Sequence, residues 1–209
     1  MEDSLNPRGL NAAFGNEPAP LPLFQRWLAE AGEAELNDPT AFALATVDAA
    51  GQPSVRMLLL KGATEAGFVF YTNMNSRKAG ELRGNPKASM CFHWKKLCRQ
   101  VRISGSVTLV SDEEADAYFA SRDHASKVGA WASLQSSAMS SRGEFEQRVT
   151  EYRAKYPEGS DVPRPPHWSG WLLQPGEVEF WLNADARLHE RLLYTAQADG
   201  SWSQALLYP

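Results

Sequence analysis

The chain has 209 residues, of which 43% are hydrophobic and 22% charged, and its formal net charge is −4. This length and composition are typical of one soluble globular domain with a full core, and the acidic balance argues against a nucleic-acid module. No apolar run approaches the roughly 20 residues that span a bilayer, and residues 1–16 lack the pattern of a secretory signal. We therefore expect a cytoplasmic protein without a membrane or nucleic-acid partner.

The N-terminal part of the chain changes character near residue 20. Residues 1–20 contain three prolines and two glycines with little periodicity, which predicts a flexible N-terminal arm. Residues 21–31 carry apolar side chains at helical spacing and predict a short amphipathic helix. Asn37-Asp38-Pro39 then breaks the chain.

A run of β-prone segments follows, and the short turns between them favour antiparallel hairpins over parallel βαβ units. Strands are expected at residues 42–47, 54–61, 67–72, 87–94 and 100–110. Between the third and fourth of these strands, residues 76–83 have the pattern of a short helix. Gly84 and Pro86 end that helix.

The second half of the chain begins with helices and ends with strands. Ser111 with Glu114, and Ser141 with Glu144, have capping-box spacing and predict two helix starts. The remaining strands are expected at residues 178–182, 188–196 and 202–207, the last two joined by a hairpin turn. Many short strands with few helices predict a mainly β, α+β fold. We expect a nearly closed antiparallel barrel with flanking helices in a single domain, residues 21–209.

Positive charge is concentrated in one internal stretch of this acidic chain. Residues 56–102 contain ten basic and two acidic residues, a formal +8. A cationic region of this kind indicates a discrete anionic ligand. The alternative is a set of solvated surface lysines.

Two segments of this stretch predict anion sites. In Arg56-Met57-Leu58-Leu59-Leu60-Lys61, strand alternation places the two cations on opposite faces, where they would serve two anionic groups; alternatively, they only end a buried strand. Further on, Arg77 and Lys78 follow Ser76 at a predicted helix start. The helix N-terminus and the arginine both favour a phosphate.

Three further segments have residues suited to binding. If residues 187–191 form a strand, Arg187, His189 and Arg191 share one face, beside the aromatic ring of Trp181; the alternative is a solvated strand face. Tyr118, Arg122 and Ser126 have i, i+4, i+8 spacing and predict a second phosphate site on one helical stripe. Residues 129–137 combine small residues with polar groups that can bond to a heteroaromatic edge.

Signatures of other chemistries are missing. The sequence has no glycine-rich phosphate loop and no nucleophile elbow. Its four histidines are far apart, so no metal site is predicted. The spacing of Cys91 and Cys98 fits neither a metal site nor a redox pair, and we expect free thiols.

Together, these segments resemble the pyridoxine (pyridoxamine) 5′-phosphate oxidase family from about residue 21 to the C-terminus. The order and spacing of the matching motifs are more specific than any one of them. The motifs are RMLLLK at 56–61, FYTN at 70–73, SRKAGEL at 76–82, RQVRISG at 99–105, YFASR at 118–122, SKVGAWASLQSS at 126–137, PPHWSGW at 165–171, EFW at 179–181 and RLHERLLY at 187–194.

The resemblance implies a split β-barrel that binds FMN and works as a homodimer with the flavin at the subunit interface. Residues 170–209 would supply C-terminal dimerisation and active-site strands. The implied reaction is oxidation of pyridoxine 5′-phosphate or pyridoxamine 5′-phosphate to pyridoxal 5′-phosphate. Dioxygen would reoxidise the flavin and give hydrogen peroxide.

The resemblance also implies roles for individual residues. The residues implied to bind FMN are Arg56, Met57, Leu58, Leu59, Leu60, Lys61, Tyr71, Thr72, Arg77, Lys78, Gln100, Gln135, Ser136, Trp181 and Arg191. Those implied to bind the substrate are Lys61, Tyr118, Arg122 and Ser126 at its phosphate, and Arg187, Leu188 and His189 at its ring. Arg187 and His189 are the expected catalytic residues, because they would orient the substrate and assist proton loss as hydride leaves.

Some positions depart from the family pattern, and two other functions stay open. The N-terminal arm has Arg8 but no tyrosine to cover a substrate, and the last strand lacks the arginine often found there. One alternative is a related split-barrel flavin oxidase with another substrate, such as a dihydrophenazine. Retention of the implied phosphate-binding residues argues against it. The other alternative is a non-catalytic flavin or haem carrier.

Overall fold

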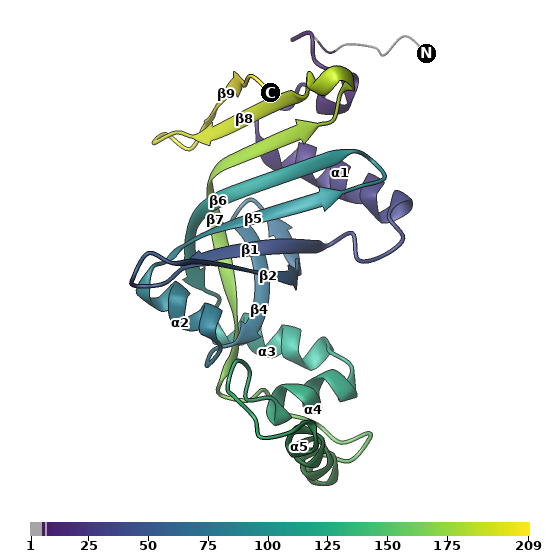
Figure 1. Ribbon diagram of the computed structural model, residues 1–209, viewed down its shortest axis with the longest axis vertical. Helices are drawn as coiled ribbons and strands as arrows, with labels where there is room; N and C mark the ends of the chain where they lie inside the picture. The colour runs from purple at the N-terminus through teal and green to yellow at the C-terminus, as the bar shows by residue number, and fades with distance from the viewer. Residues whose placement is uncertain (1–5, 7) are drawn as a thin grey trace.

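The computed structural model describes residue 6 and residues 8–209, and its described strands form one antiparallel sheet with helices around it (Figure 1). The strands are β1 (Ala41–Val47), β2 (Pro53–Leu59), β3 (Gly62–Thr64), β4 (Gly67–Asn73), β5 (Lys87–Trp94), β6 (Arg99–Leu109), β7 (Trp168–Leu182), β8 (Glu190–Ala196) and β9 (Trp202–Leu206). The helices are α1 (Pro20–Ala34), α2 (Arg77–Gly84), α3 (Asp112–Ser121), α4 (His124–Ala132) and α5 (Arg142–Lys155), with 3-10 turns η1 (Ala12–Phe14) and η2 (Asp185–Arg187).

The sheet is curled into a barrel that is split along one side. Its strand order is β2-β1-β5-β6-β7-β4-β3, so β2 and β4 lie far apart in the order. At one end, the Leu60 N–H donates to the Thr40 carbonyl and the Lys61 N–H to the Val69 carbonyl, both at 2.9 Å. No strand pairing joins β2 to β4 within the described residues. The predicted antiparallel split barrel with flanking helices is confirmed.

The long strand β7 organises the molecule because its two halves have different neighbours. Residues 168–173 pair with β4, residues 177–182 pair with β8, and β6 runs along both halves. The change occurs at a register shift after Ser104. Gly105 is required there, because a Cβ on it would lie 1.9 Å from the Gln174 carbonyl oxygen. The bulge thus separates the barrel from the β8–β9 hairpin at the other end of the molecule.

The core lies between the sheet and α1. Alternate residues of β1 point inward, as the period of a strand dictates. From α1, Phe24 packs edge-on against Phe68 and Phe92, with ring centroids 5.0 and 5.2 Å away. Trp27 does the same against Phe180 at 5.2 Å. Each such buried side chain contributes about 1.5–3 kcal/mol, and together they fix α1 on the barrel.

The predicted elements agree with the structure in part. Seven of the eight predicted strands, the helix predicted at residues 76–83 and the helices after Ser111 and Ser141 are present within one or two residues. The predictions missed β3, α4 and the first half of β7, and β8 begins at residue 190 rather than 188. The Ser111 hydroxyl caps α3, accepting from the Glu114 N–H at 3.1 Å. No described helix has the length and apolar character needed to cross a membrane.

The N-terminal segment differs from the predicted flexible arm. Phe14 is fully buried, and the Trp27 indole N–H donates to the Ala13 carbonyl at 2.8 Å. The Asn11 N–H also donates to the Glu190 carboxylate at 2.6 Å. Phe14 and these hydrogen bonds, with a further one from Arg26 Nη1 to the Ala13 carbonyl at 2.9 Å, dock residues 11–14 on the body of the protein. Residues 1–5 and 7 of the arm lie outside the described residues.

Candidate active site

Lys78, in the first turn of α2, is a buried ammonium group surrounded by neutral oxygens. Only 6% of the residue is exposed. Its Nζ donates to Thr72 Oγ1 at 3.2 Å, Ser76 Oγ at 3.3 Å and Gln135 Oε1 at 3.0 Å. Burial, together with the positive charge of Arg56, lowers the pKa of Lys78 to about 8. Within the described residues it forms no salt bridge, so an anion bound here would supply the missing counter-charge.

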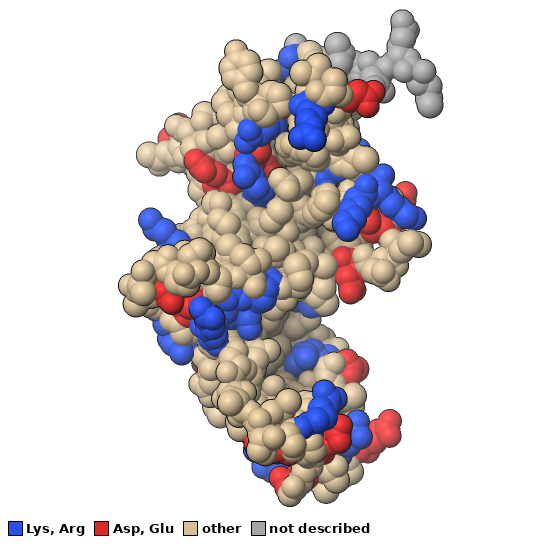
Figure 2. Space-filling view, in the orientation of Figure 1, with Lys and Arg blue, Asp and Glu red and all other residues tan. Residues whose placement is uncertain are grey.

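Glu81, one turn further along α2, joins two arginines. Its carboxylate accepts from Arg77 Nε at 2.8 Å and from Arg56 Nη2 at 3.1 Å. The hydroxyl groups of Ser54 and Thr46 also donate to it. Burial opposes ionisation of Glu81, but hydrogen bonds from the two hydroxyls and Arg77, with the charge of Arg56, outweigh burial and lower its pKa to about 2. Figure 2 shows Lys and Arg side chains gathered over α2.

Beside Lys78, a hollow of about 370 Å³ opens between β4, α4 and the start of β7. Arg122 lines it, and the Nη1 atom of Arg122 is buried without a hydrogen-bond partner. The guanidinium lies 5.0 Å above the Trp168 ring, and burial lowers the Arg122 pKa. Thr72 and Gln135, which bind Lys78, also line this hollow. Lys78 and the hollow lined by Arg122 thus share Thr72 and Gln135 as polar neighbours.

The predicted helical stripe of Tyr118, Arg122 and Ser126 is wrong, although the break in the helix still gathers these residues. Arg122 ends α3, and Asp123 starts α4 by accepting from the Ser126 N–H at 2.8 Å. Arg122 and Ser126 then line the same hollow. Tyr118 stacks on Tyr71, which also lines it, with ring centroids 4.0 Å apart.

A second cluster lies on β6, β7 and β8. Gln100 is paired in register with Trp181, and Trp181 with Arg191, so these three predicted residues form one row across the sheet. The Trp181 ring lies 4.6 Å from His189. Arg191 Nε donates to the buried Glu179 at 2.8 Å, and this hydrogen bond raises the pKa of Arg191. The row provides a flat aromatic surface with polar groups at both ends.

The predicted shared strand face of Arg187, His189 and Arg191 is wrong, because only Arg191 is in β8. Ala186 and Arg187 adopt left-handed backbone conformations, with φ of 52° and 63°, which cost roughly 1–2 kcal/mol per residue outside glycine. The His189 ring accepts from the Ala184 N–H through Nδ1 at 3.2 Å. A strained turn, rather than a strand, therefore presents Arg187 and His189.

The structure does not bring all predicted site residues together in one chain. The Trp181–His189 cluster lies at the β8 end of the molecule, whereas the hollow lies beside α3 and α4 at the other end (Figure 1). Lys61 is exposed and lines a separate hollow against α1. Of the other predicted residues, Leu58 lines the Arg122 hollow, Leu60 is buried, Met57, Leu59 and Leu188 are exposed, and Ser136 lines a neighbouring pocket.

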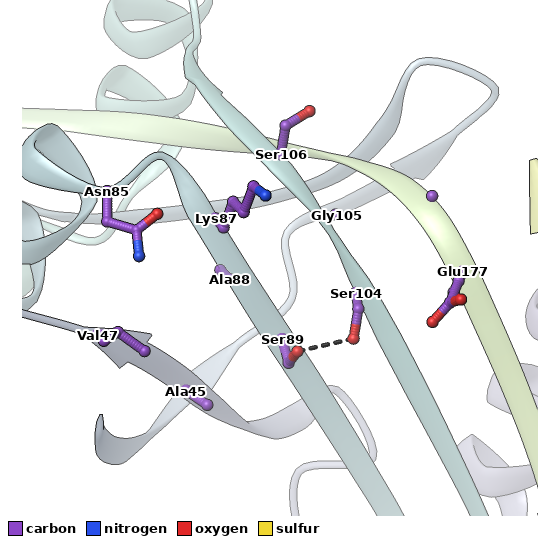
Figure 3. Close-up of a pocket in the computed structure, with 11 residues that line it drawn as sticks. Ala45, Val47, Asn85, Lys87, Ala88, Ser89, Ser104, Gly105, Ser106 and Glu177 are labelled. Atoms are coloured by element: carbon purple, nitrogen blue, oxygen red, sulfur yellow. Dashed lines mark hydrogen bonds between the residues drawn. The ribbon is translucent and has the colours of Figure 1, made fainter. Parts of the chain in front are cut away.

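A larger hollow, about 520 Å³, lies on the outer face of β1, β5 and β6 (Figure 3). Small residues line it, and Ser89 and Ser104 bond to each other at 2.7 Å. Its charged residues are Lys87 and Glu177. We place the site at the smaller hollow instead, because that one contains the unpartnered Arg122 nitrogen and adjoins Lys78. No cluster of three or more metal-ligating side chains occurs within the described residues.

Two models of known protein families match most of the chain. A family model described as pyridoxamine 5′-phosphate oxidase matches residues 28–156, and one described as the pyridoxine 5′-phosphate oxidase C-terminal dimerisation region matches residues 168–209. The chain belongs to the pyridoxamine 5′-phosphate oxidase family. The C-terminal match includes the whole Trp181–His189 cluster except Gln100.

Relatives within the pyridoxamine 5′-phosphate oxidase family match nearly the whole chain. Pyridoxine/pyridoxamine 5′-phosphate oxidase from Pelagibacter ubique is 53% identical over 98% of both chains. The protein of that name from Zymomonas mobilis is 55% identical over 91% of this chain and 98% of its own. Among solved structures, PhzG from Burkholderia lata, in complex with tetrahydrophenazine-1-carboxylic acid, has a TM-score of 0.89 at 32% identity, covering 99% of this chain and 98% of its own. An FMN-binding protein from Nostoc punctiforme shares the fold, with a TM-score of 0.74 at 22% identity over 93% and 100% of the two chains.

Within this family framework, sequence reasoning missed Glu81, Trp168 and Glu179. Glu81 had a usable signal, since it is one of two acidic residues in the basic stretch and lies four residues after Arg77. Trp168 and Glu179 had none, because their contacts with arginines depend on strand register and on the α3–α4 break.

Proposed function

We propose that this protein oxidises pyridoxine 5′-phosphate and pyridoxamine 5′-phosphate to pyridoxal 5′-phosphate, with bound FMN as the hydride acceptor and dioxygen as the final acceptor. The observation that carries the proposal is the pair of adjoining cationic positions at Lys78 and Arg122. Lys78 is buried, Arg122 is half-buried with a buried Nη1 atom, and within the described residues neither has a carboxylate in salt-bridge contact. Two phosphorylated molecules bound side by side require such a pair.

The residues around Lys78 fit the phosphate and ribityl chain of FMN. Lys78 would provide the buried charge, Arg77 has two free guanidinium nitrogens, and Thr72 and Gln135 offer polar atoms. When bound, the flavin accepts the hydride, which protein side chains cannot do. The row of Gln100, Trp181 and Arg191 would hold the remainder of the cofactor.

The substrate phosphate would bind to Arg122 and Ser126, with Tyr118 at the side of the hollow. Lys61 is a further proposed cation, although it lines a separate hollow in this chain. The unpartnered Nη1 of Arg122 supports this role, because a charged donor left unpaired in a buried position is costly. Arg187 and His189 would hold the substrate ring. His189 would assist loss of the proton from the alcohol or amine, which requires its Nδ1 to release the Ala184 N–H.

We further propose a homodimer with FMN at the subunit interface. One protomer would supply Lys78 and Arg122, and its partner the Trp181–His189 cluster, because the two groups lie at opposite ends of one chain. The match to a dimerisation region that contains the second cluster supports this arrangement. Val55 and Met57 of β2, each 64% exposed, provide apolar surface for such a contact.

The visible spectrum and peroxide production test the function. The purified protein is expected to be yellow, or to become so on loading with FMN, and to release peroxide when either phosphorylated vitamer is added under air. A protein that cannot be loaded with FMN would disprove the proposal. Loading without peroxide from either vitamer would instead favour a related flavin oxidase whose substrate, like the tetrahydrophenazine-1-carboxylic acid bound in the PhzG complex, has no phosphate for Arg122.

A further inference from the structure

Glu81 is a buried carboxylate to which the proposed mechanism gives no role. Only 7% of the residue is exposed. It lies between Arg77 and Arg56, two of the residues expected to hold the cofactor. A negative charge beside an anion site weakens anion binding by electrostatic repulsion. A carboxylate in this position therefore calls for a second role that offsets the repulsion.

The contacts of Glu81 fix α2 against the barrel. Arg77 and Glu81 lie on α2, Thr46 on β1, and Ser54 and Arg56 on β2. One carboxylate therefore connects one helix to two strands through hydrogen bonds from four side chains. The helix end that carries Lys78 is held in place by the same contacts.

Glu81 also determines how each arginine is used. It accepts from the Nε of Arg77 and leaves Nη1 and Nη2 of that side chain without a hydrogen bond in the described structure. Arg77 is 60% exposed along its side chain, so without this bond it would sample many conformations. The Nη groups of Arg56, in contrast, are already occupied by Leu44, Thr46, Ser54 and Glu81.

We propose that Glu81 is a positioning residue for the cofactor phosphate, acting by holding the Arg77 guanidinium and the α2 N-terminus in the orientation that receives it. The inference rests on the proposed binding of FMN. Because Arg77 is already ordered, FMN binding costs little conformational entropy at this side chain. This lower entropic cost outweighs the electrostatic repulsion between the Glu81 carboxylate and the phosphate.

Three accounts of Glu81 predict different results for Glu81→Gln. If Glu81 positions Arg77, the variant binds FMN more weakly but binds riboflavin, which lacks the phosphate, as well as before. If Glu81 is only a repelling charge, the variant binds FMN more tightly. If Glu81 only stabilises the fold, both ligands lose affinity by the same factor.

The experiment is a fluorescence titration of the FMN-free full-length protein with FMN and with riboflavin. For Glu81→Gln we expect the Kd of FMN to rise about tenfold and that of riboflavin to stay within about twofold of wild type. Glu146→Gln is the matched control. It breaks another arginine–glutamate pair at i, i+4, to Arg142 at 3.2 Å on the exposed surface of α5, and should change neither Kd.

A tighter or unchanged Kd for FMN, or an equal loss for both ligands, would overturn the inference and leave the proposed function intact. A wild-type protein that binds no FMN would overturn both. Should Glu81→Gln not fold, Thr46→Val removes one hydroxyl from the carboxylate at nearly constant volume, with the same phosphate-specific loss expected at about threefold.

A second comparison identifies the residue through which Glu81 acts. In an Arg77→Ala background, Glu81→Gln should weaken FMN binding by less than about threefold, because the side chain that it positions is gone. A full tenfold effect in that background would show that Glu81 does not act through Arg77 and would overturn the assignment.

Discussion

The contacts of Lys78 are costly to stability and suited to the anion-binding role proposed for it. A lysine with three neutral oxygen partners and no carboxylate holds its charge poorly, and its pKa is lowered to about 8. The FMN-free protein therefore bears a cost at neutral pH that a bound phosphate would remove. Stability and function are in direct conflict at this one side chain.

Replacing Lys78 by methionine should accordingly stabilise the FMN-free protein while abolishing FMN binding. At pH 7 we expect the free energy of unfolding to rise by about 1–3 kcal/mol, since one unit of pKa shift corresponds to about 1.4 kcal/mol. The gain should disappear as pH rises from about 8 to 10.5. Across that window the unfolded wild-type chain binds more protons than the folded one, so wild-type stability increases with pH.

Denaturant unfolding at pH 7 and at several values up to pH 10 measures this effect. Lys87→Met serves as the control because Lys87 is exposed on β5, and it should show no such pH-dependent gain. A destabilised Lys78→Met protein, or a gain that does not change with pH, would show that Lys78 is well solvated or paired in the native state.

At the scale of elements, the sequence predicts the strands and helices that depend on the local periodicity of apolar residues. It misses those that depend on pairing with distant parts of the chain. The strands at 87–94 and 100–110 follow from β-prone runs between turns, and their pairing in β5 and β6 agrees. The first half of β7 was missed because residues 168–173 follow a proline-rich segment and pair with β4, a strand about 100 residues earlier. The turn at residues 185–187 was missed because nothing in Asp-Ala-Arg predicts left-handed backbone.

The bulge at Gly105 is the element-scale feature with the clearest consequence. A methyl group there would meet the Gln174 carbonyl oxygen at 1.9 Å, so Gly105→Ala must displace β6 from β7. We expect a loss of about 2–4 kcal/mol in the free energy of unfolding, measured by chemical denaturation. Gly32→Ala, in the interior of α1 with open space around it, should instead add about 0.5–1 kcal/mol. Equal effects of the two substitutions would contradict the role given to the bulge.

For the whole molecule, the sequence identifies the residue types of the site but not their arrangement. Residues 56–61, 76–78 and 118–126 predict cationic groups for two phosphates, although the helical spacing assumed for the last segment is wrong. Their separation from His189 is not predicted, because it depends on the curl of the sheet and on β7 changing neighbours halfway along. The proposed site residues are thus divided between the two ends of one chain, and under the proposed function a second copy would combine them.

Mixed dimers test this division directly. Arg122→Glu impairs the hollow, and His189→Ala impairs the cluster near β8, so each variant alone should have little activity. If each site combines the two parts from different protomers, a mixed dimer contains one site with both defects and one site with none. Unfolding and refolding an equal mixture of the variants should then restore about a quarter of wild-type activity, because random pairing makes half of the dimers mixed and each of these has one intact site. If both parts of a site came from the same protomer, every site in the mixture would carry one defect. Activity would then stay at the level of the single variants, and the shared site would be disproved.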